Sequence, residues 1–171
     1  SITIDPPTAP EAGVEPTPTP VRNISWSVED PNMDKVTSKL ELRVPGGTWI
    51  TLEDDLIETS WSWDTRQVAD GRYEVRVEAT DAATNPKGGA KTASRVSEAV
   101  VVDNTPPTIG DITTNAEKGK ITVNLRVADR TGLIRSLEYK LDGAKDWQRV
   151  LPADNISDSP DEQYAIVLSN S

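Results

Sequence analysis

The chain has 171 residues, which is enough for one large domain or two small ones. Its formal net charge is −10 and it contains neither cysteine nor histidine, which excludes disulfides, thiolate metal sites and catalytic triads built on those residues. An acidic chain without a Lys/Arg cluster repels phosphate groups, so we do not expect nucleic acid as a partner. No apolar run reaches the ~18 residues of a membrane span, so membrane insertion is not expected either.

Residues 1–20 are rich in proline, which cannot donate a hydrogen bond to a β-ladder. We expect an extended segment or the tail of a preceding repeat there. Ile2-Thr3-Ile4-Asp5-Pro6-Pro7 echoes the later segment Val100–Pro107. Ile2–Asp5 is therefore also a candidate opening strand, or a strand donated to another part of the chain.

From residue 21 onward, apolar residues alternate with polar ones in short segments separated by Gly, Pro, Asn and Asp clusters, which predicts β-strands. No segment has the apolar spacing of a helix, so the expected fold class is all-β. The expected strands are Ile24–Val28, Leu40–Val44, Trp49–Leu52, Ile57–Trp63, Tyr73–Ala79 and Val96–Val102. About six or seven strands in roughly 85 residues are typical of a β-sandwich, which we place at residues 21–107.

The same pattern then restarts at an offset of about 98 positions, which indicates an internal repeat. Thr122–Asp129 matches Asn23–Asp30, and Leu137–Leu141 with Trp147 matches Leu40–Val44 with Trp49. We therefore expect a second sandwich at residues 108–171. Tyr164–Leu168 corresponds either to the strand at Ile57–Trp63, leaving two strands missing, or to Tyr73–Val77, leaving one. Either way the second sandwich is incomplete at its C-terminal strands, and we expect an excerpt of a longer protein or strands supplied from elsewhere.

Several of these residues resemble a known family. Ile24-Ser25-Trp26, Trp49 and Asp70–Ala79 resemble the fibronectin type III and immunoglobulin-like sandwich pattern. Trp63-Asp64-Thr65 and Val102–Pro107 resemble bacterial immunoglobulin-like repeats that end in a Val-Asp-Asn-Thr-Pro-Pro joint. The resemblance covers roughly residues 20–168 and implies two tandem sandwiches downstream of a β-propeller or enzymatic domain in a secreted bacterial protein. One departure is that Leu125 stands where the first repeat has Trp26.

An acidic loop after the first strand offers oxygen ligands at every second residue: Asp30, Asn32 and Asp34. In a sandwich, Asp81 and Asn85 would lie at the same pole, and this set is a candidate for weak Ca²⁺ binding. The alternative is that these residues only make turns, since Asx residues do so without a metal. Met33 stands where a glycine would ease the turn, and a bidentate Glu is missing. Asp103–Pro107 presents a similar choice between a plain stiff joint and a calcium-rigidified one.

Trp61 and Trp63 are two positions apart and share one face of a strand, so they serve either the core or a sugar-stacking platform. We expect Trp63, like Trp26 with Ile24 and Val28, in the core, and we keep Trp61 as the ligand candidate. Carboxylates are numerous but fall on predicted turns and solvent faces. We therefore expect no enzyme activity.

The sequence thus predicts a non-catalytic structural, spacer or interaction module of a larger exported bacterial protein, located outside the cell, on its surface or in the periplasm. Its expected partners are neighbouring domains of the same polypeptide. The alternative is an adhesin-like module that binds a cell-surface glycan or protein through Trp61 or a loop pole, with calcium as a stiffening ion. The parent protein, the ligand and the oligomeric state do not follow from the sequence.

Overall fold

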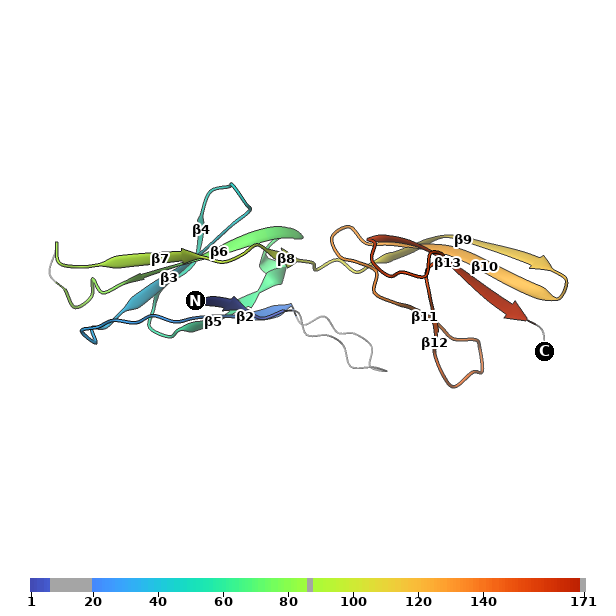
Figure 1. The fold of residues 1–171 in the computed structure, drawn as a ribbon, viewed down its shortest axis with the longest axis horizontal. Coiled ribbons are helices and arrows are strands. Elements are labelled where there is room, and N and C mark those ends of the chain that lie inside the picture. Colours follow the sequence, from blue (N-terminus) through green and yellow to red (C-terminus); the bar gives the residue numbers. More distant parts are fainter. Residues whose placement is uncertain (7–19, 86–87, 170–171) are drawn as a thin grey trace. The chain divides into compact units, whose positions relative to one another are not determined.

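A computed structural model describes residues 1–6, 20–85 and 88–169 of the chain, and it confirms the all-β expectation. Over these ranges the only helical element is a single 3-10 turn, η1 (Thr65–Gln67). Most of the predicted Pro-rich segment, residues 7–19, lies outside the described residues. The chain divides into two compact units, unit 1 (Ser1–Asn104) and unit 2 (Thr105–Ser171). The boundary between them falls within the predicted joint, Asp103–Pro107. Each unit is described by itself (Figure 1).

One sheet of unit 1 has three antiparallel strands in the order β1-β2-β5. Their bounds are β1 (Ile2–Ile4), β2 (Val21–Trp26) and β5 (Ser60–Asp64). β1 lies along β2 with Ile2 opposite Trp26, and the backbone N–H of Asp5 donates to Asn23 at 3.0 Å. Ile2–Ile4 is therefore the opening strand of unit 1. The alternative in which Ile2–Asp5 completes the second unit is wrong, because these backbone groups already pair with β2.

The other sheet of unit 1 runs in the order β4-β3-β6, with β7 and β8 one after the other along the far edge of β6. The bounds are β3 (Thr37–Arg43), β4 (Ile50–Leu56), β6 (Gly71–Thr80), β7 (Thr92–Val96) and β8 (Val100–Val102). The predicted strand Val96–Val102 is broken at Ser97. The backbone N–H of Ser97 donates to Val75 O at 2.8 Å, and the Ser97 hydroxyl accepts from the Val75 N–H at 3.0 Å. The serine side chain thus takes the place of a ladder carbonyl.

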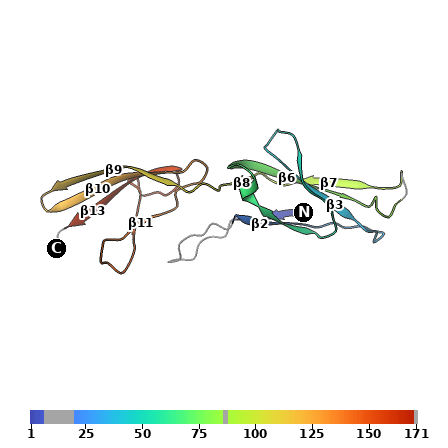
Figure 2. The same ribbon diagram turned by 180° about the vertical axis from the view of Figure 1, so that it is seen from behind.

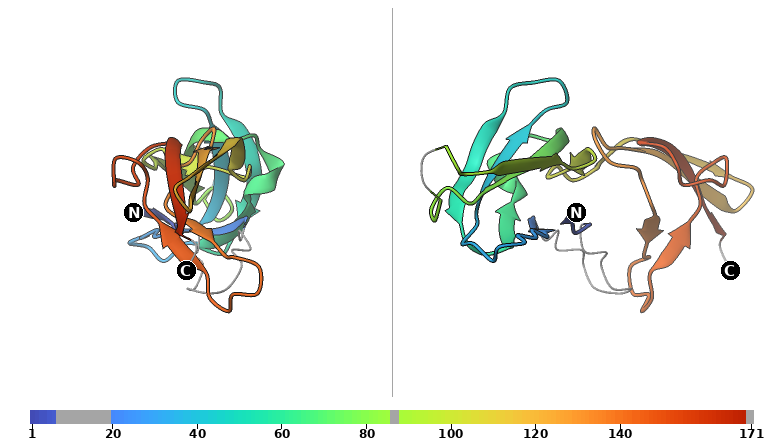
Figure 3. Two further views of the ribbon diagram at one scale, coloured as in Figure 1. Left: turned by 90° about the vertical axis from the view of Figure 1, so that its right-hand side faces the viewer. Right: turned by 60° about the vertical axis from the view of Figure 1, so that its left-hand side comes forward.

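Both sheets of unit 1 contribute to one core, which gives the two layers seen in Figure 3. The buried apolar residues are Ile24, Trp26, Leu40, Leu42, Trp63, Val75, Val77 and Val102. The Trp26 indole N–H donates to Ser38 Oγ at 3.1 Å and so links the sheets. Val28 is a correction: it is 37% exposed, because β2 ends at Trp26 and the chain leaves the core face.

Unit 2 contains a three-stranded sheet in the order β13-β10-β9 and a separate hairpin, β11-β12 (Figure 2). The bounds are β9 (Thr108–Glu117), β10 (Lys120–Ala128), β11 (Leu137–Tyr139), β12 (Gln148–Val150) and β13 (Asp161–Ser169). The small core is Leu125, Val127, Ile134, Tyr164 and Ile166. β13 pairs with β10 as β5 pairs with β2. This pairing matches the first alternative, in which Tyr164–Leu168 corresponds to Ile57–Trp63.

The hairpins β3-β4 and β11-β12 share the start of their turn and the register of the two residue pairs next to it, although the β11-β12 loop is one residue longer and only β3-β4 has register shifts further along. The turn glycine has φ = 78° in both, at Gly46 and Gly143, a left-handed conformation that glycine adopts without strain. The same backbone bond closes each turn, at 2.8 Å to Val44 O and at 3.0 Å to Leu141 O. In register, Leu42 lies opposite Ile50 and Tyr139 opposite Gln148. Among the described residues of unit 2, no strand corresponds to β6, β7 or β8.

Candidate functional site

Three carboxylates from two loops meet at one end of unit 1. Asp30 and Asp34 follow β2, and Asp81 follows β6, so a loop from each sheet contributes. One carboxylate oxygen from each of the three lies within 4.8 Å of the others. The predicted meeting of Asp30, Asp34 and Asp81 at one pole is therefore present, and we call these three residues the acidic pole.

Each member of the acidic pole takes part in hydrogen bonds that shape its loop. Asp30 Oδ1 accepts the backbone N–H groups of Asn32 at 2.8 Å and Asp34 at 3.4 Å. Asp81 Oδ1 accepts the N–H of Lys91 at 2.6 Å, and Asn85 Nδ2 donates to Asp34 Oδ2 at 3.2 Å. Asn32 therefore takes part in this network through its backbone N–H group. These bonds favour the turn-making interpretation, because each carboxylate anchors a loop.

The strained point of this loop is Met33, whose φ of 57° lies in the left-handed region. Met33 is the most exposed large apolar residue of the described chain. Beside it lies a hollow of about 260 Å³ lined by Asp34, Ser38, Ile57 and other residues. Asp30 and Asp34 line this hollow, whereas Asp81 does not. The three carboxylates of the acidic pole are hard oxygen ligands of the kind that Ca²⁺ takes, but Ca²⁺ prefers roughly six to eight, so water would have to supply the rest.

Trp63 and Trp61 differ in their burial. Trp63 is 0% exposed and its ring meets that of Tyr73 edge-on, with centroids 6.4 Å apart, which confirms its place in the core. Trp61 is only partly buried and packs against the same core. Because a stacking platform needs an open ring face, the partial burial of Trp61 limits how much of the indole a sugar can cover.

The first half of the predicted joint is fastened to unit 1. The Asn104 N–H donates to Asp70 Oδ1 at 2.6 Å, and its side-chain amide donates to Thr65 O at 3.0 Å. The Thr65 hydroxyl bonds Pro20 O at 2.7 Å and Asn104 Oδ1 at 3.0 Å. Asn104 therefore acts as a structural clamp between η1 and the end of β8.

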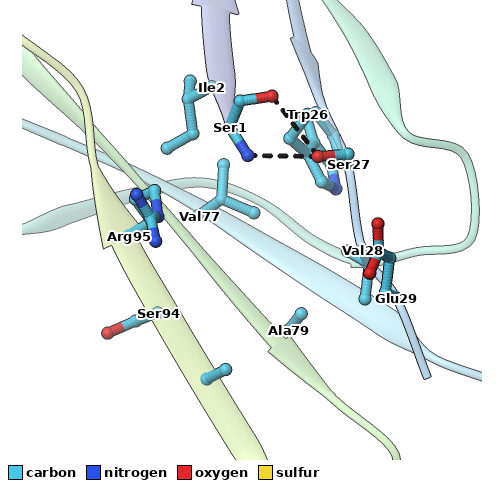
Figure 4. A pocket seen from close by; sticks show the side chains of 11 residues that line it. Ser1, Ile2, Trp26, Ser27, Val28, Glu29, Val77, Ala79, Ser94 and Arg95 are labelled. Atoms are coloured by element: carbon cyan, nitrogen blue, oxygen red, sulfur yellow. Dashed lines mark hydrogen bonds between the residues drawn. The ribbon is translucent and has the colours of Figure 1, made fainter. Parts of the chain in front are cut away.

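A second hollow, of about 210 Å³, opens between β2, β6 and β7 (Figure 4). Trp26, Val77 and Ala79 form its apolar floor, and Arg95 lies at its side. Its polar lining includes Ser1, Ser27, Glu29 and Ser94. The Ser1 amino group donates to the Ser27 hydroxyl at 3.1 Å.

The outward face of β3 and β6 carries a charged ladder that the sequence reasoning missed. Arg76 Nε donates to Glu41 Oε2 at 2.6 Å, and Arg43 Nε donates to Glu74 Oε2 at 2.7 Å. Both guanidinium groups lie over the Trp49 ring, at 4.5 Å and 4.2 Å from its centroid. The Arg76 hydrogen bond holds the pKa of Glu41 below its ordinary value, although burial opposes the shift.

A signal for this ladder is present in the sequence. Lys39, Glu41 and Arg43 alternate in charge on one strand, and Glu74, Arg76 and Glu78 alternate with opposite sign on the other. Opposite charges that lie across an antiparallel pair attract, so the two patterns specify each other's register. The ladder also shields Glu41, which is only 6% exposed.

Comparison of the chain with protein-family models, curated proteins and solved structures finds no match. Over residues 1–6, 20–85 and 88–169, no helix has the length and apolar character to cross a membrane.

Proposed function

We propose that the chain is a non-catalytic structural module of two tandem immunoglobulin/fibronectin type III-like sandwiches, acting as a spacer between neighbouring domains of a larger exported bacterial protein. The strand order of unit 1 carries the proposal. Strands 1, 2 and 5 form one sheet, while strands 3, 4, 6 and 7 with 8 form the other. Named A to G in chain order, the strands form the sheets A-B-E and D-C-F-G. This order differs from the constant-type immunoglobulin plan only in the sheet that holds the fourth strand, and it supports the proposal of an immunoglobulin-like sandwich.

A hydrogen bond at the start of β6 supports the same fold. The Tyr73 hydroxyl donates to the carbonyl of Ala69, four residues upstream, at 2.8 Å. A tyrosine at the start of the sixth strand that bonds back to the preceding corner is a hallmark of immunoglobulin-like sandwiches. Their inter-sheet disulfide is missing, since the chain has no cysteine, and Trp26 and Trp63 fill the core instead.

The use of polar groups supports a structural role rather than a chemical one. Charged side chains of unit 1 form cross-strand ion pairs, as Glu41 does with Arg76, and Asp81 shapes its loop by accepting the Lys91 backbone N–H. Such bonds fix register and loop shape. A spacer requires a defined shape, and these contacts supply it.

The alternative function is binding of a cell-surface glycan or protein, and the partial exposure of Trp61 is the observation that favours it. A glycan array probed with the chain and with Trp61→Ala separates the two functions. A spacer gives no specific signal with either protein. Binding that disappears with Trp61→Ala would overturn the spacer proposal in favour of the adhesin-like one, and binding that survives the substitution would move the ligand site to a loop pole.

A further inference from the structure

The β11-β12 hairpin of unit 2 has an open edge at a position that is occupied in unit 1. β3 lies between β4 and β6, with seven residue pairs joining it to β6. β11 pairs with β12 alone in the part of the chain that the structure describes. Because the two hairpins share the start of their turn and the register of the two residue pairs next to it, the free edge of β11 corresponds to the edge of β3 that receives β6.

The outward side of this edge carries two residues that hold an arginine in unit 1. Glu41 comes just before Leu42, and Trp49 just before its partner Ile50. Arg76 of β6 donates a hydrogen bond to Glu41 and lies over the Trp49 ring. Glu138 and Trp147 have the same places around the Tyr139–Gln148 pair.

In unit 2, Glu138 and Trp147 have no counterpart of Arg76 among the described residues. Glu138 is exposed and has no ion-pair partner among the described residues. Trp147 is 61% exposed, whereas Trp49 is half-buried. The Lys140 ammonium lies 5.4 Å from the Trp147 centroid, and Lys140 follows Tyr139 as Arg43 follows Leu42 in unit 1. One of two cations is therefore in place, and the place of Arg76 is open.

The inward side of the edge is also incomplete. Leu40 and Leu42 are buried opposite Val77 and Val75 of β6, while Leu137 and Tyr139 on β11 are only half-buried. Deeper in the same core, Tyr164 is 2% exposed and its hydroxyl has no hydrogen-bond partner among the described residues. The buried Trp63 indole N–H of unit 1 also has no partner among the described residues, so the half-burial of Leu137 and Tyr139 is what distinguishes the inward side of β11 from that of β3.

We propose that the β11 edge of unit 2 is the docking site for a β-hairpin supplied by polypeptide other than the described residues. Its first strand pairs antiparallel with β11 and carries an arginine between two apolar residues. The arginine binds Glu138 and covers Trp147, and the apolar residues cover Leu137 and Tyr139. A second copy of the chain is not the expected occupant, because Arg76 and its strand are already paired in unit 1.

The test uses the hairpin of unit 1 as the probe. The full chain is extended at its C-terminus by a flexible Gly/Ser linker of ~20 residues and a second copy of residues 70–104, so that docking is intramolecular. Backbone hydrogen exchange is then measured by mass spectrometry at residues 137–139, with β10 as the internal reference for a folded unit 2. Docking slows exchange at 137–139 by about tenfold or more relative to the unextended chain.

Charge exchange makes the test specific. Arg76→Glu in the appended copy, or Glu138→Arg in unit 2, removes the slowing, and the two changes together restore it. Arg72→Glu in the appended copy is the matched control and leaves the slowing intact. Unchanged exchange on adding the hairpin, or failure of the paired charges to restore it, overturns the proposal. So does sedimentation showing a dimer of the unextended chain in which residues 137–139 are already protected, since a second copy would then be the occupant.

Discussion

At the scale of single residues, the core of unit 1 depends on Trp63, the largest of its fully buried side chains. We expect Trp63→Ala to lower the free energy of unfolding of unit 1 by about 3–5 kcal/mol, the range for truncating a buried aromatic residue. Trp61→Ala, two positions along the same strand, removes a half-buried ring and costs clearly less. Urea unfolding of both variants measures the difference, and equal losses would place the two indoles in equivalent environments, contrary to the structure.

The sequence predicted burial correctly for residues in segments where apolar and polar residues alternate. Alternation assigned Ile24, Leu40 and Val75 to the buried face because each lies inside a strand with one side on the core. The prediction that Val28 lies in the core was wrong, because the apolar alternation continues in the sequence after the strand has ended at Trp26. Alternation records which face a residue would occupy, but it does not record where the strand stops.

At the scale of paired strands, the β3–β6 ladder makes the stability of unit 1 depend on pH. The pKa of Glu41 is lowered from its ordinary value of 4.5, chiefly by the Arg76 hydrogen bond. For a lowered pKa, the stabilisation is complete above the unfolded value and is lost as the pH falls from about 4.5 through the lower folded value. Glu41→Gln should therefore be less stable than the native chain at neutral pH, with the gap narrowing in acid.

Urea unfolding between about pH 6 and pH 3 measures this gap. The control is the same Glu41→Gln substitution made in an Arg76→Met variant, where the hydrogen bond to Glu41 is already lost. There, the change in unfolding free energy caused by Glu41→Gln should vary little with pH. A gap that stays constant down to the lowest pH in the native background would show that the pair does not couple to folding.

The loops of the acidic pole allow a test with metal. Because Asp30, Asp34 and Asp81 already anchor their loops by accepting N–H groups, we expect Ca²⁺ to leave the melting temperature unchanged. A site of the affinity usual in extracellular modules, with Kd up to ~1 mM, would add about 1.4 kcal/mol at ~10 mM Ca²⁺. That would raise Tm by roughly 5 °C or more. Such a rise, absent with NaCl of equal ionic strength and in Asp81→Asn, would favour the calcium-stiffened alternative.

Strand positions were largely predictable, and their exceptions have physical causes. β6 and β10 lie within two residues of their expected ranges, because each has one buried face and hence clear alternation. β9 was not expected, since all ten of its residues are exposed and its pattern carries no burial signal. The break at Ser97 was also missed, because a side-chain hydroxyl that substitutes for a carbonyl leaves no trace in the apolar pattern.

At the scale of the whole molecule, several strand pairings of unit 1 have a counterpart in unit 2. β9, β10 and β13 pair in the order of β1, β2 and β5, and the hairpin β11-β12 repeats β3-β4. The internal repeat in the sequence predicted that β10 corresponds to β2 and β11 to β3, but it did not predict a counterpart of β1. The sequence alone left the assignment of Tyr164–Leu168 open, because both candidate strands alternate in the same way and only the pairing with β10 distinguishes them.

The most direct test of this account is backbone hydrogen exchange of the unmodified chain, comparing Thr37–Arg43 of β3 with Leu137–Tyr139 of β11. β3 is hydrogen-bonded on both edges and β11 on one, over the described residues. The account predicts that exchange in β11 is at least about tenfold faster than in β3. Equal and strong protection of the two strands would contradict it, because unit 2 would then have a covered edge.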